Sequence, residues 1–258
     1  MKLYFKYFSI HLRSAMEYKA SFFMTLTGQF LLSFTGFLAV WFLMDRFHEV
    51  EGFTFGEVLL CYSIVLLGYS VAECFFRGFD LFHQMIGNGE FDRILTRPRN
   101  EIFQVLASKI EFTRIGKFLQ AVLVICYALP TSNVTWNGKN IVTLILMVLG
   151  TFLVFACLFI LYACFSFFTI EGLEFMNIFT NGGCEFGQYP FSVYGKQILW
   201  FFTFVIPLAL CQYYPLLSLL GREIHSFDRF LPLCSILFLI PVLVFWKFGV
   251  RHYKSTGS

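Results

Sequence analysis

A polar stretch, 87-GNGEFDRILTRPRN-100, interrupts a chain that is otherwise rich in Phe, Leu, Ile and Val. Its Gly-Asn-Gly opening tolerates positive φ and indicates a chain break. Phe91, Ile94 and Leu95 follow at i, i+3 and i+4, which predicts one apolar face of a short helix. Acidic side chains come first and arginines last, as the helix dipole favours, and Pro98 ends the helix.

A helix of two turns is marginal on its own, so we expect this one to dock its apolar face. One alternative is that it packs on the helix ends of its own chain. The other is that it inserts into a groove of a separate cytoplasmic subunit. We therefore predict that this stretch binds another surface and catalyses no reaction. The candidate contact residues are Glu90, Phe91, Asp92, Arg93, Ile94, Leu95, Arg97 and Pro98.

A second group of charges lies just before this stretch. Glu73, Arg77 and Asp80 are spaced i, i+4 and i+7, which predicts that they share one helical face. A carboxylate at the centre of a bilayer costs about 2.5–3.5 kcal/mol on insertion scales. A pair between Glu73 and Arg77 would reduce that cost. The three residues are therefore either a polar patch that lines a path or contacts a partner, or a pair that satisfies itself at the membrane surface.

The motifs of common enzymes do not occur in the sequence. The five histidines are far apart, and there is no HExxH, GxSxG or CxxC. A GxxxxGK[ST] nucleotide-binding loop is also absent. We therefore predict no catalytic residue, no metal site and no cofactor in this chain, and we do not expect an enzyme.

The composition indicates which elements position these residues. The chain of 258 residues is 58% apolar and only 14% charged, whereas a soluble domain carries about a quarter charged residues. Apolar runs near the 20 residues that a membrane helix needs predict an all-α integral membrane protein with six spans in one domain, residues 1–258. The spans are expected at about 22–44, 57–79, 108–130, 141–170, 198–215 and 230–250. An amphipathic segment, 1–21, precedes them, and 80–107 forms a polar loop.

The distribution of basic residues predicts the orientation. With both termini in the cytoplasm, the inner segments hold fifteen Lys and Arg, including Lys196, and the outer loops hold four. The net charge of +3 is thus a topology signal, and because the basic residues are spread over several loops it does not indicate nucleic-acid binding. The first apolar run is too long for a signal peptide, so we expect no cleavage.

Prolines mark the outer ends of the last two spans. Pro207, Pro215 and Pro232 would each interrupt a helix there. Non-helical backbone at membrane depth persists only when it is buried or lines water. We therefore predict short re-entrant helices on the outer side over residues 208–229.

Two motifs carry a family resemblance. The opening stretch resembles the G-x-[LF]-D-x-x-L-x-R-P-x-N loop of ABC-2-type transporter permeases, in the six-span branch of about 260 residues that includes viologen- and drug-exporter-like permeases. The segment 189-YPFSVYGKQILWFFTFVIPLALCQYYPLLSLLG-221 is similar to the YP-x-x-[IV]-Y loop and following span of that branch. Phe91 departs from the leucine common in this loop, and residues 181–187 are substituted, so we assign them no role.

The resemblance implies a mechanism. Residues 90–98 would be the coupling helix, seated in a groove of a cytoplasmic ATPase subunit. Two such subunits would bind ATP and Mg, and a second permease, identical or homologous, would complete the exporter. The outer elements would form an exit gate, with Pro207, Tyr213, Tyr214 and Pro215. The resemblance further implies a bacterial inner-membrane protein that moves a hydrophobic or amphipathic compound, which we expect to enter from the surrounding lipids.

Three other functions stay open at this point. A transporter or channel working alone usually shows internal repeats, and none is visible between the two halves of the sequence. An intramembrane enzyme would need clustered acids, bases or metal ligands. A non-transporting immunity or scaffold protein would purify without an ATPase partner.

Overall fold

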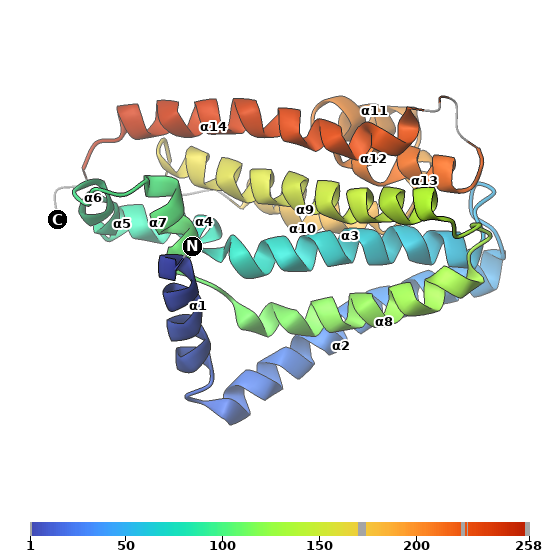
Figure 1. Ribbon diagram of the computed structural model, residues 1–258, viewed down its shortest axis with the longest axis horizontal. Coiled ribbons are helices and arrows are strands. Elements are labelled where there is room, and N and C mark those ends of the chain that lie inside the picture. The colour runs from blue at the N-terminus through green and yellow to red at the C-terminus, as the bar shows by residue number, and fades with distance from the viewer. Residues whose placement is uncertain (1, 170–173, 223–224, 226, 256–258) are drawn as a thin grey trace.

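The computed structural model describes residues 2–169, 174–222, 225 and 227–255. They form a bundle whose long helices run along the longest axis of the molecule (Figure 1). Both termini lie at one end of the bundle, which we call the terminal end, and we call the opposite one the far end. No β-strand occurs in these described ranges. The prediction of an all-α protein is confirmed.

Five helical segments are long and apolar enough to cross a membrane. The first two are α2 (Lys19–Phe47) and α3 (Phe55–Phe75). The third joins the short helix η1 (Phe112–Arg114) to α8 (Ile115–Thr131), and the fourth is α9 (Gly138–Ser166). The fifth joins η3 (Asp228–Cys234) to α14 (Ser235–His252).

These five segments correspond to predicted spans one, two, three, four and six. Their boundaries differ from the expected ones by a few residues each, and two of these differences bear on the candidate residues. Span three was expected from residue 108 but begins at 112, because residues 109–111 are not helical. Span two was expected to reach residue 79, but α3 ends at Phe75 and a separate turn, α4 (Arg77–Asp80), follows. Residue 170, the predicted end of span four, lies outside the described residues.

The predicted span at 198–215 is not one continuous helix. Residues 196–219 instead form α11 (Lys196–Phe204), α12 (Leu208–Cys211) and α13 (Tyr213–Leu219), and the chain bends by 84° between Phe204 and Leu208. Pro207 causes the break, because it lacks the N–H that would continue the helix. Short helices over 208–229 were predicted and are present, although residues 223, 224 and 226 of that segment lie outside the described residues.

An unpredicted helix, α10 (Phe175–Gly187), precedes this bent segment. It begins at the terminal end and stops where Gly187 meets Val65, halfway along α3. Figure 1 places α11, α12 and α13 in the half of the bundle away from the termini. Lys196, the first residue of α11, therefore belongs to the far half, and the predicted assignment to the inner side is wrong. With Lys196 counted on the outer side, the inner segments hold fourteen Lys and Arg and the outer loops hold five. The excess of basic residues still favours the same orientation.

Helix α3 forms the centre of the bundle, since nearly all its residues are buried. It crosses α9 closely at Gly68. A methyl group on Gly68 would lie 2.8 Å from the Phe152 nitrogen and 2.8 Å from Thr151 Cγ2. Only glycine therefore allows this crossing. By contrast few residues of α2 are fully buried, although it packs on α8 along part of its length (Figure 1).

We expect Gly68→Val to lower the free energy of unfolding by about 1–3 kcal/mol, because the added side chain overpacks the crossing of α3 and α9. Thermal unfolding in lipid nanodiscs measures the change. Gly28→Ala is the matched control, since Gly28 lies within α2 with nothing within 4 Å of the new methyl group. An unchanged unfolding temperature for Gly68→Val would contradict the close crossing.

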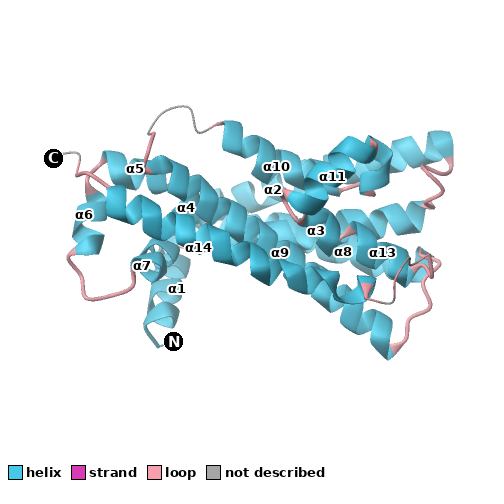
Figure 2. Ribbon diagram, turned by 90° about the horizontal axis from the view of Figure 1, so that it is seen from above, coloured by secondary structure: helices cyan, strands magenta, loops and turns pink. Residues whose placement is uncertain are grey.

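Five short helices gather at the terminal end (Figure 2). They are α1 (Lys2–Ala15), the turn α4, α5 (Phe82–Gly87), α6 (Glu90–Leu95) and α7 (Glu101–Ser108). The amphipathic α1 lies across the direction of the bundle and contacts α7 and η1 through Tyr4 and Phe8. The predicted amphipathic N-terminal segment is thus a separate helix.

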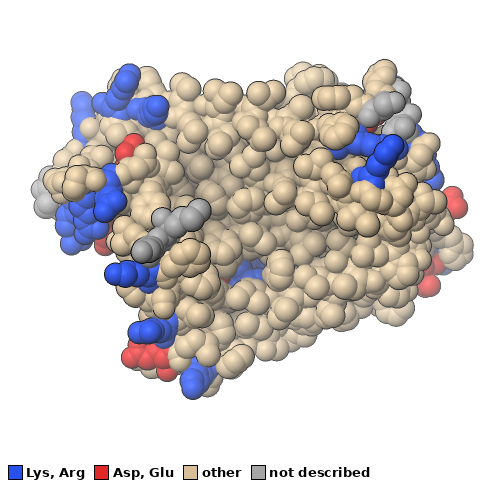
Figure 3. Space-filling view, viewed as in Figure 1, with Lys and Arg blue, Asp and Glu red and all other residues tan. Residues whose placement is uncertain are grey.

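Charged side chains gather at the two ends of the molecule, with a largely uncharged band between them (Figure 3). A small basic patch shows in a hollow inside that band. Many large apolar side chains are exposed, among them Leu32, Phe42 and Leu237, and a water-soluble surface would not present so many. The chain is a multi-pass membrane protein.

Candidate functional site

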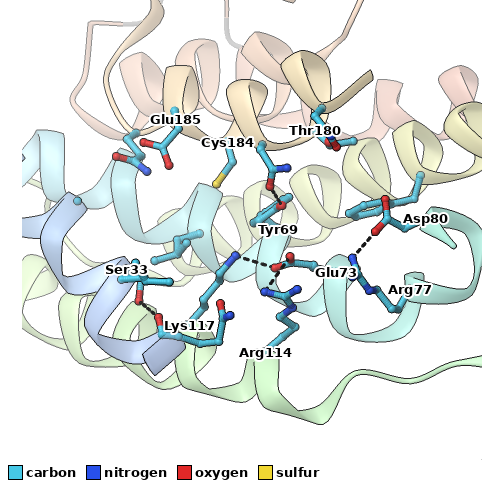
Figure 4. A pocket seen from close by; sticks show the side chains of 18 of the residues that line it. Ser33, Tyr69, Glu73, Arg77, Asp80, Arg114, Lys117, Thr180, Cys184 and Glu185 are labelled. Carbon is cyan, nitrogen blue, oxygen red and sulfur yellow. Dashed lines mark hydrogen bonds and ion pairs between the residues drawn. The ribbon is translucent and has the colours of Figure 1, made fainter. Parts of the chain in front are cut away.

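A cavity of about 660 Å³ lies inside the bundle, between α2, α3, α10 and the start of α8 (Figure 4). The lining residues show how far the cavity extends along the bundle. It reaches from Gly36 and Tyr62, near the middle of α2 and α3, to Asp80 and His83 at the terminal end. The cavity therefore occupies the half of the bundle nearer the termini.

Helix α10 lines the cavity with polar side chains. Asn177, Asn181 and Glu185 follow at i, i+4 and i+8, so they lie on one face of the helix. The Tyr69 hydroxyl on α3 donates a hydrogen bond to the Asn181 side-chain oxygen, which ties α10 to α3. The sequence analysis assigned no role to residues 181–187. The i, i+4, i+8 spacing of these polar residues could have predicted a helix with one polar face, but the sequence analysis did not use it.

Glu73 anchors an ion cluster on the opposite wall. It is 5% exposed, its carboxylate lies 2.9 Å from Lys117 Nζ and 3.3 Å from Arg114 Nη1, and Lys117 also lies over the Tyr69 ring. Arg114 comes from η1 and Lys117 from α8, so the cluster joins these elements to α3. A buried carboxylate needs such partners, because an unpaired charge there is strongly disfavoured. Arg114 and Lys117 were missed in the sequence.

The expected pair between Glu73 and Arg77 does not form. The helix breaks at Phe76, so the two residues no longer share the i, i+4 register. Arg77 instead pairs with Asp80, and its Nε lies 3.9 Å from the Glu111 carboxylate. Burial raises the pKa of the Asp80 carboxyl, and the neighbouring Arg77 guanidinium opposes that rise. Glu73, Arg77 and Asp80 nevertheless all line the same cavity.

We expect Glu73→Gln to destabilise the protein by about 3–5 kcal/mol, because it leaves the largely buried Arg114 and Lys117 without their carboxylate. Thermal unfolding in nanodiscs checks this. Adding Lys117→Met should recover part of the loss, since one buried cation is then removed with the carboxylate. Glu49→Gln, on an exposed loop, is the control. A double variant no more stable than Glu73→Gln alone would contradict the pairing.

The helix α6 begins at Glu90 as predicted but ends at Leu95, before the expected stop at Pro98, and its apolar side chains point in different directions. Gly89 begins it with φ +67°, the left-handed conformation expected of the glycine break. Phe91 is 0% exposed and Ile94 is buried, whereas Leu95 is 43% exposed. The phenylalanine therefore faces the protein's own bundle, as in the first of the two alternatives.

An aromatic cluster surrounds Phe91 and joins α6 to the ends of α9 and α14. The Phe91 ring centroid lies 5.0 Å from that of Phe82, 5.5 Å from Phe167 and 5.1 Å from Tyr253, and Trp246 fills the interior. These rings meet edge to face, the arrangement favoured by their quadrupoles. Phenylalanine in place of leucine thus supplies the large ring that this cluster needs.

The outward face of α6 carries the other candidate residues. Glu90, Arg93, Arg97 and Pro98 are exposed, as is Leu95. A groove of about 250 Å³ runs beside them, between α6, α7 and α1, with Tyr7 and Gln104 among its lining residues. Asp92 is half-buried and accepts a hydrogen bond from the Ser255 hydroxyl at 2.7 Å, which holds the C-terminal segment against α6.

Beyond the cavity, toward the far end of the bundle, the bent segment packs on the end of α10. Gln212 is 0% exposed and donates from Nε2 to the carbonyl oxygens of Gly187 and Tyr189, each at 3.3 Å. Pro207 and Pro215 are buried beside it. Tyr214 lies 3.4 Å from the Thr203 hydroxyl, and the Tyr213 ring packs on Phe53 of the loop before α3. The four predicted gate residues therefore lie in one segment, and it spans from mid-bundle to the far end.

The arrangement is suited to binding. In the part of the chain that is described, no group of three His, Cys, Asp or Glu side chains could hold a metal ion. The cavity instead offers charged and amide groups beside the edges of Tyr62, Tyr69 and Tyr162.

A family model described as "ABC-2 family transporter protein" matches residues 30–257, which is most of the chain. The chain belongs to the ABC-2 transporter family. This confirms the resemblance that the two motifs indicated. ABC-2 permeases are membrane components of transport systems that work with ATPase subunits, so the chain is a permease component and not itself the catalyst. No curated protein and no solved structure gives a significant match.

Proposed function

We propose that the chain is the transmembrane permease of an ATP-driven exporter in a bacterial inner membrane, with both termini in the cytoplasm. The polar cavity is the observation that carries this proposal. It lies in the terminal half between helices long and apolar enough to cross a membrane, and beyond it the bent segment packs on the end of α10 through Gln212. A polar cavity between membrane-spanning helices is the kind of site in which a transporter holds its cargo.

The energy would come from two copies of a cytoplasmic ATPase subunit that bind ATP and Mg. The outward face of α6 supplies a contact for that subunit, because Leu95 is exposed between Arg93 and Arg97. An apolar side chain framed by charged ones is typical of the centre and rim of a protein interface. This contact keeps the coupling role predicted for residues 90–98 but moves it to the other face of the helix.

A second permease would cover the open side of the cavity. Helix α2 lines the cavity with Gln29 and Ser33, and few of its residues are fully buried by the rest of the chain. A polar cavity facing lipid is unfavourable, so a second copy or a homologous neighbour is expected to close it. Cargo would then pass between the two permeases. The short helices holding Pro207, Tyr213, Tyr214 and Pro215 would be its exit gate.

Co-purification and transport test this function together. The permease is expressed with the ATPase encoded beside it, captured through a tag on the permease, and reconstituted into vesicles. We expect a stable complex of two permeases and two ATPases that transports only with ATP and Mg. Transport that continues without any ATPase would refute the proposal in favour of a stand-alone transporter.

A further inference from the structure

Two side chains that anchor the bent segment differ in character. One is Gln212, between α12 and α13, which is 0% exposed and donates to the carbonyl oxygens of Gly187 and Tyr189. The other is Arg222, just after α13, whose side chain is 44% exposed and reaches the loop before α3. Figure 1 shows the end of α13 and this loop at the far end of the bundle. Water can therefore replace the hydrogen bonds of Arg222 far more easily than those of Gln212.

The backbone of Arg222 is fixed to α13 by the way this helix ends. Gly221 adopts φ +70°, the left-handed conformation that glycine allows. The Arg222 N–H donates to the Leu217 carbonyl oxygen at 2.8 Å, and the Gly221 N–H donates to that of Ser218 at 3.2 Å. These two bonds are the Schellman ending of a helix, so Arg222 moves with α13. Arg229 Nε donates to the Ser218 hydroxyl at 2.8 Å, so η3 is expected to move with α13 as well.

The Arg222 side chain contacts the turn before α3 in three ways. Its Nη1 donates to the Gly52 carbonyl oxygen at 2.9 Å, its guanidinium carbon lies 5.4 Å from the Phe53 ring centroid, and its Nη2 lies 3.7 Å from the Glu57 carboxylate. The turn is a firm partner, because Val50 and Phe53 exchange both of their backbone hydrogen bonds. One side chain thus joins the outer end of the bent segment to the central helix of the bundle.

Glu57 also has partners other than Arg222. It is 1% exposed, and its carboxylate accepts hydrogen bonds from the Thr54 N–H at 3.1 Å and from Asn133 Nδ2 at 3.2 Å. The bond from Thr54 belongs to the capping box that begins α3. Detachment of Arg222 should therefore leave the beginning of α3 folded.

We propose that Arg222 is a releasable latch that holds the bent segment closed against α3, and that Gln212 stays attached as the pivot when the segment opens. This rests on the proposed transport function, in which the segment is the exit gate. Water replaces the contacts of the exposed guanidinium at little cost, whereas breaking the Gln212 bonds would leave buried polar groups unpaired. Opening would also separate the Tyr213 ring from that of Phe53, whose centroids lie 6.5 Å apart.

Hydrogen–deuterium exchange of the permease alone in nanodiscs tests the latch. In Arg222→Gln, we expect the backbone amides of residues 208–219 to exchange about tenfold faster, because local opening becomes less costly. Amides in the middle of α3 and the unfolding temperature should change little, since an ion pair with an exposed partner adds little to global stability. Unchanged exchange over residues 208–219 would overturn the latch. So would a general loss of stability that also speeds exchange in α3.

Matched variants and a covalent bridge sharpen this test. Arg46→Gln, an exposed arginine at the end of α2, should exchange as the natural protein does, and Arg222→Lys should be intermediate because lysine keeps the charge but not the planar group. The double variant Glu51→Cys with Arg222→Cys places exposed thiols on the turn and after α13, where a short bis-methanethiosulfonate joins them. The double variant should exchange fast, and the bridge should return exchange to the natural rate until it is reduced. Each single cysteine variant, treated with the same reagent, is the control. Fast exchange in the bridged protein would overturn the latch.

The permease–ATPase complex separates failure of the latch from failure of the proposed function. In the natural complex, we expect ATP and Mg to speed exchange over residues 208–219, and we expect the bridge to abolish that rise. If no ATPase is captured, the exporter proposal fails, and exchange in the permease alone still decides the latch. If the complex transports with ATP but exchange over residues 208–219 does not respond to ATP, the exporter stands and the latch is rejected.

Discussion

A Leu95→Glu substitution should abolish ATP-driven transport while leaving the permease folded in the membrane. Leu95 is 43% exposed on the outward face of α6, so a carboxylate there costs the isolated chain little. In the complex it would be forced into the apolar centre of the ATPase contact, where burying an unpaired charge is strongly unfavourable. We expect at least about a hundredfold loss of ATPase capture, equivalent to about 2.7 kcal/mol.

Capture of the ATPase by the tagged permease, followed by transport in vesicles, measures this effect. Leu95→Met keeps an apolar side chain of similar volume and should behave as the natural protein does. Full capture and full transport by Leu95→Glu would show that α6 does not contact the ATPase. The proposal for the outward face would then be abandoned.

Phe91→Asp should have a different and equally large effect, on the fold of the terminal end. Phe91 is fully buried among Phe82, Phe167 and Tyr253. Removing a buried phenylalanine costs about 3–5 kcal/mol, and the buried carboxylate adds to this. We expect a lower unfolding temperature in nanodiscs and faster proteolysis of the loop 80–107, even when no ATPase is present.

Phe91→Leu, which restores the residue common in related loops, should cost much less because the site remains apolar. A Phe91→Asp permease that is as stable as the natural protein but captures no ATPase would reverse the interpretation. Phe91 would then be a partner contact, as the sequence alone suggested. The two substitutions, four positions apart, thus distinguish the inward and outward faces of one short helix.

Sequence patterns predicted the elements whose physics is local. Long uncharged runs gave α2, α9 and α14, since a membrane span is defined by length and hydropathy. The glycine break and the spacing of Phe91, Ile94 and Leu95 gave α6. Which side of α6 packs inward was not predictable, because all three residues are apolar and only tertiary contacts separate them.

The cavity was harder to predict for two reasons. Helix α10 is only 13 residues long and carries polar residues such as Asn181 and Glu185, so it lacks the hydropathy of a span. The partners of Glu73 stand more than forty positions away, at Arg114 and Lys117, and a pairing across two helices leaves no periodic pattern in one sequence. The break at Phe76, which redirects Arg77, has no proline beside it, and Gly78 two residues later was not used as a signal.

Few residues of α2 are fully buried by the rest of its own chain, and this exposure bears on the assembly of the protein in the cell. A copy newly inserted alone would set Gln29, Asn177 and Glu185 against acyl chains, because nothing in the described chain covers that side. We expect unassembled permeases to be degraded rapidly by membrane proteases unless they pair with a second permease. Supply of the second permease, more than the synthesis rate of this chain, would then set how many working pumps a cell maintains.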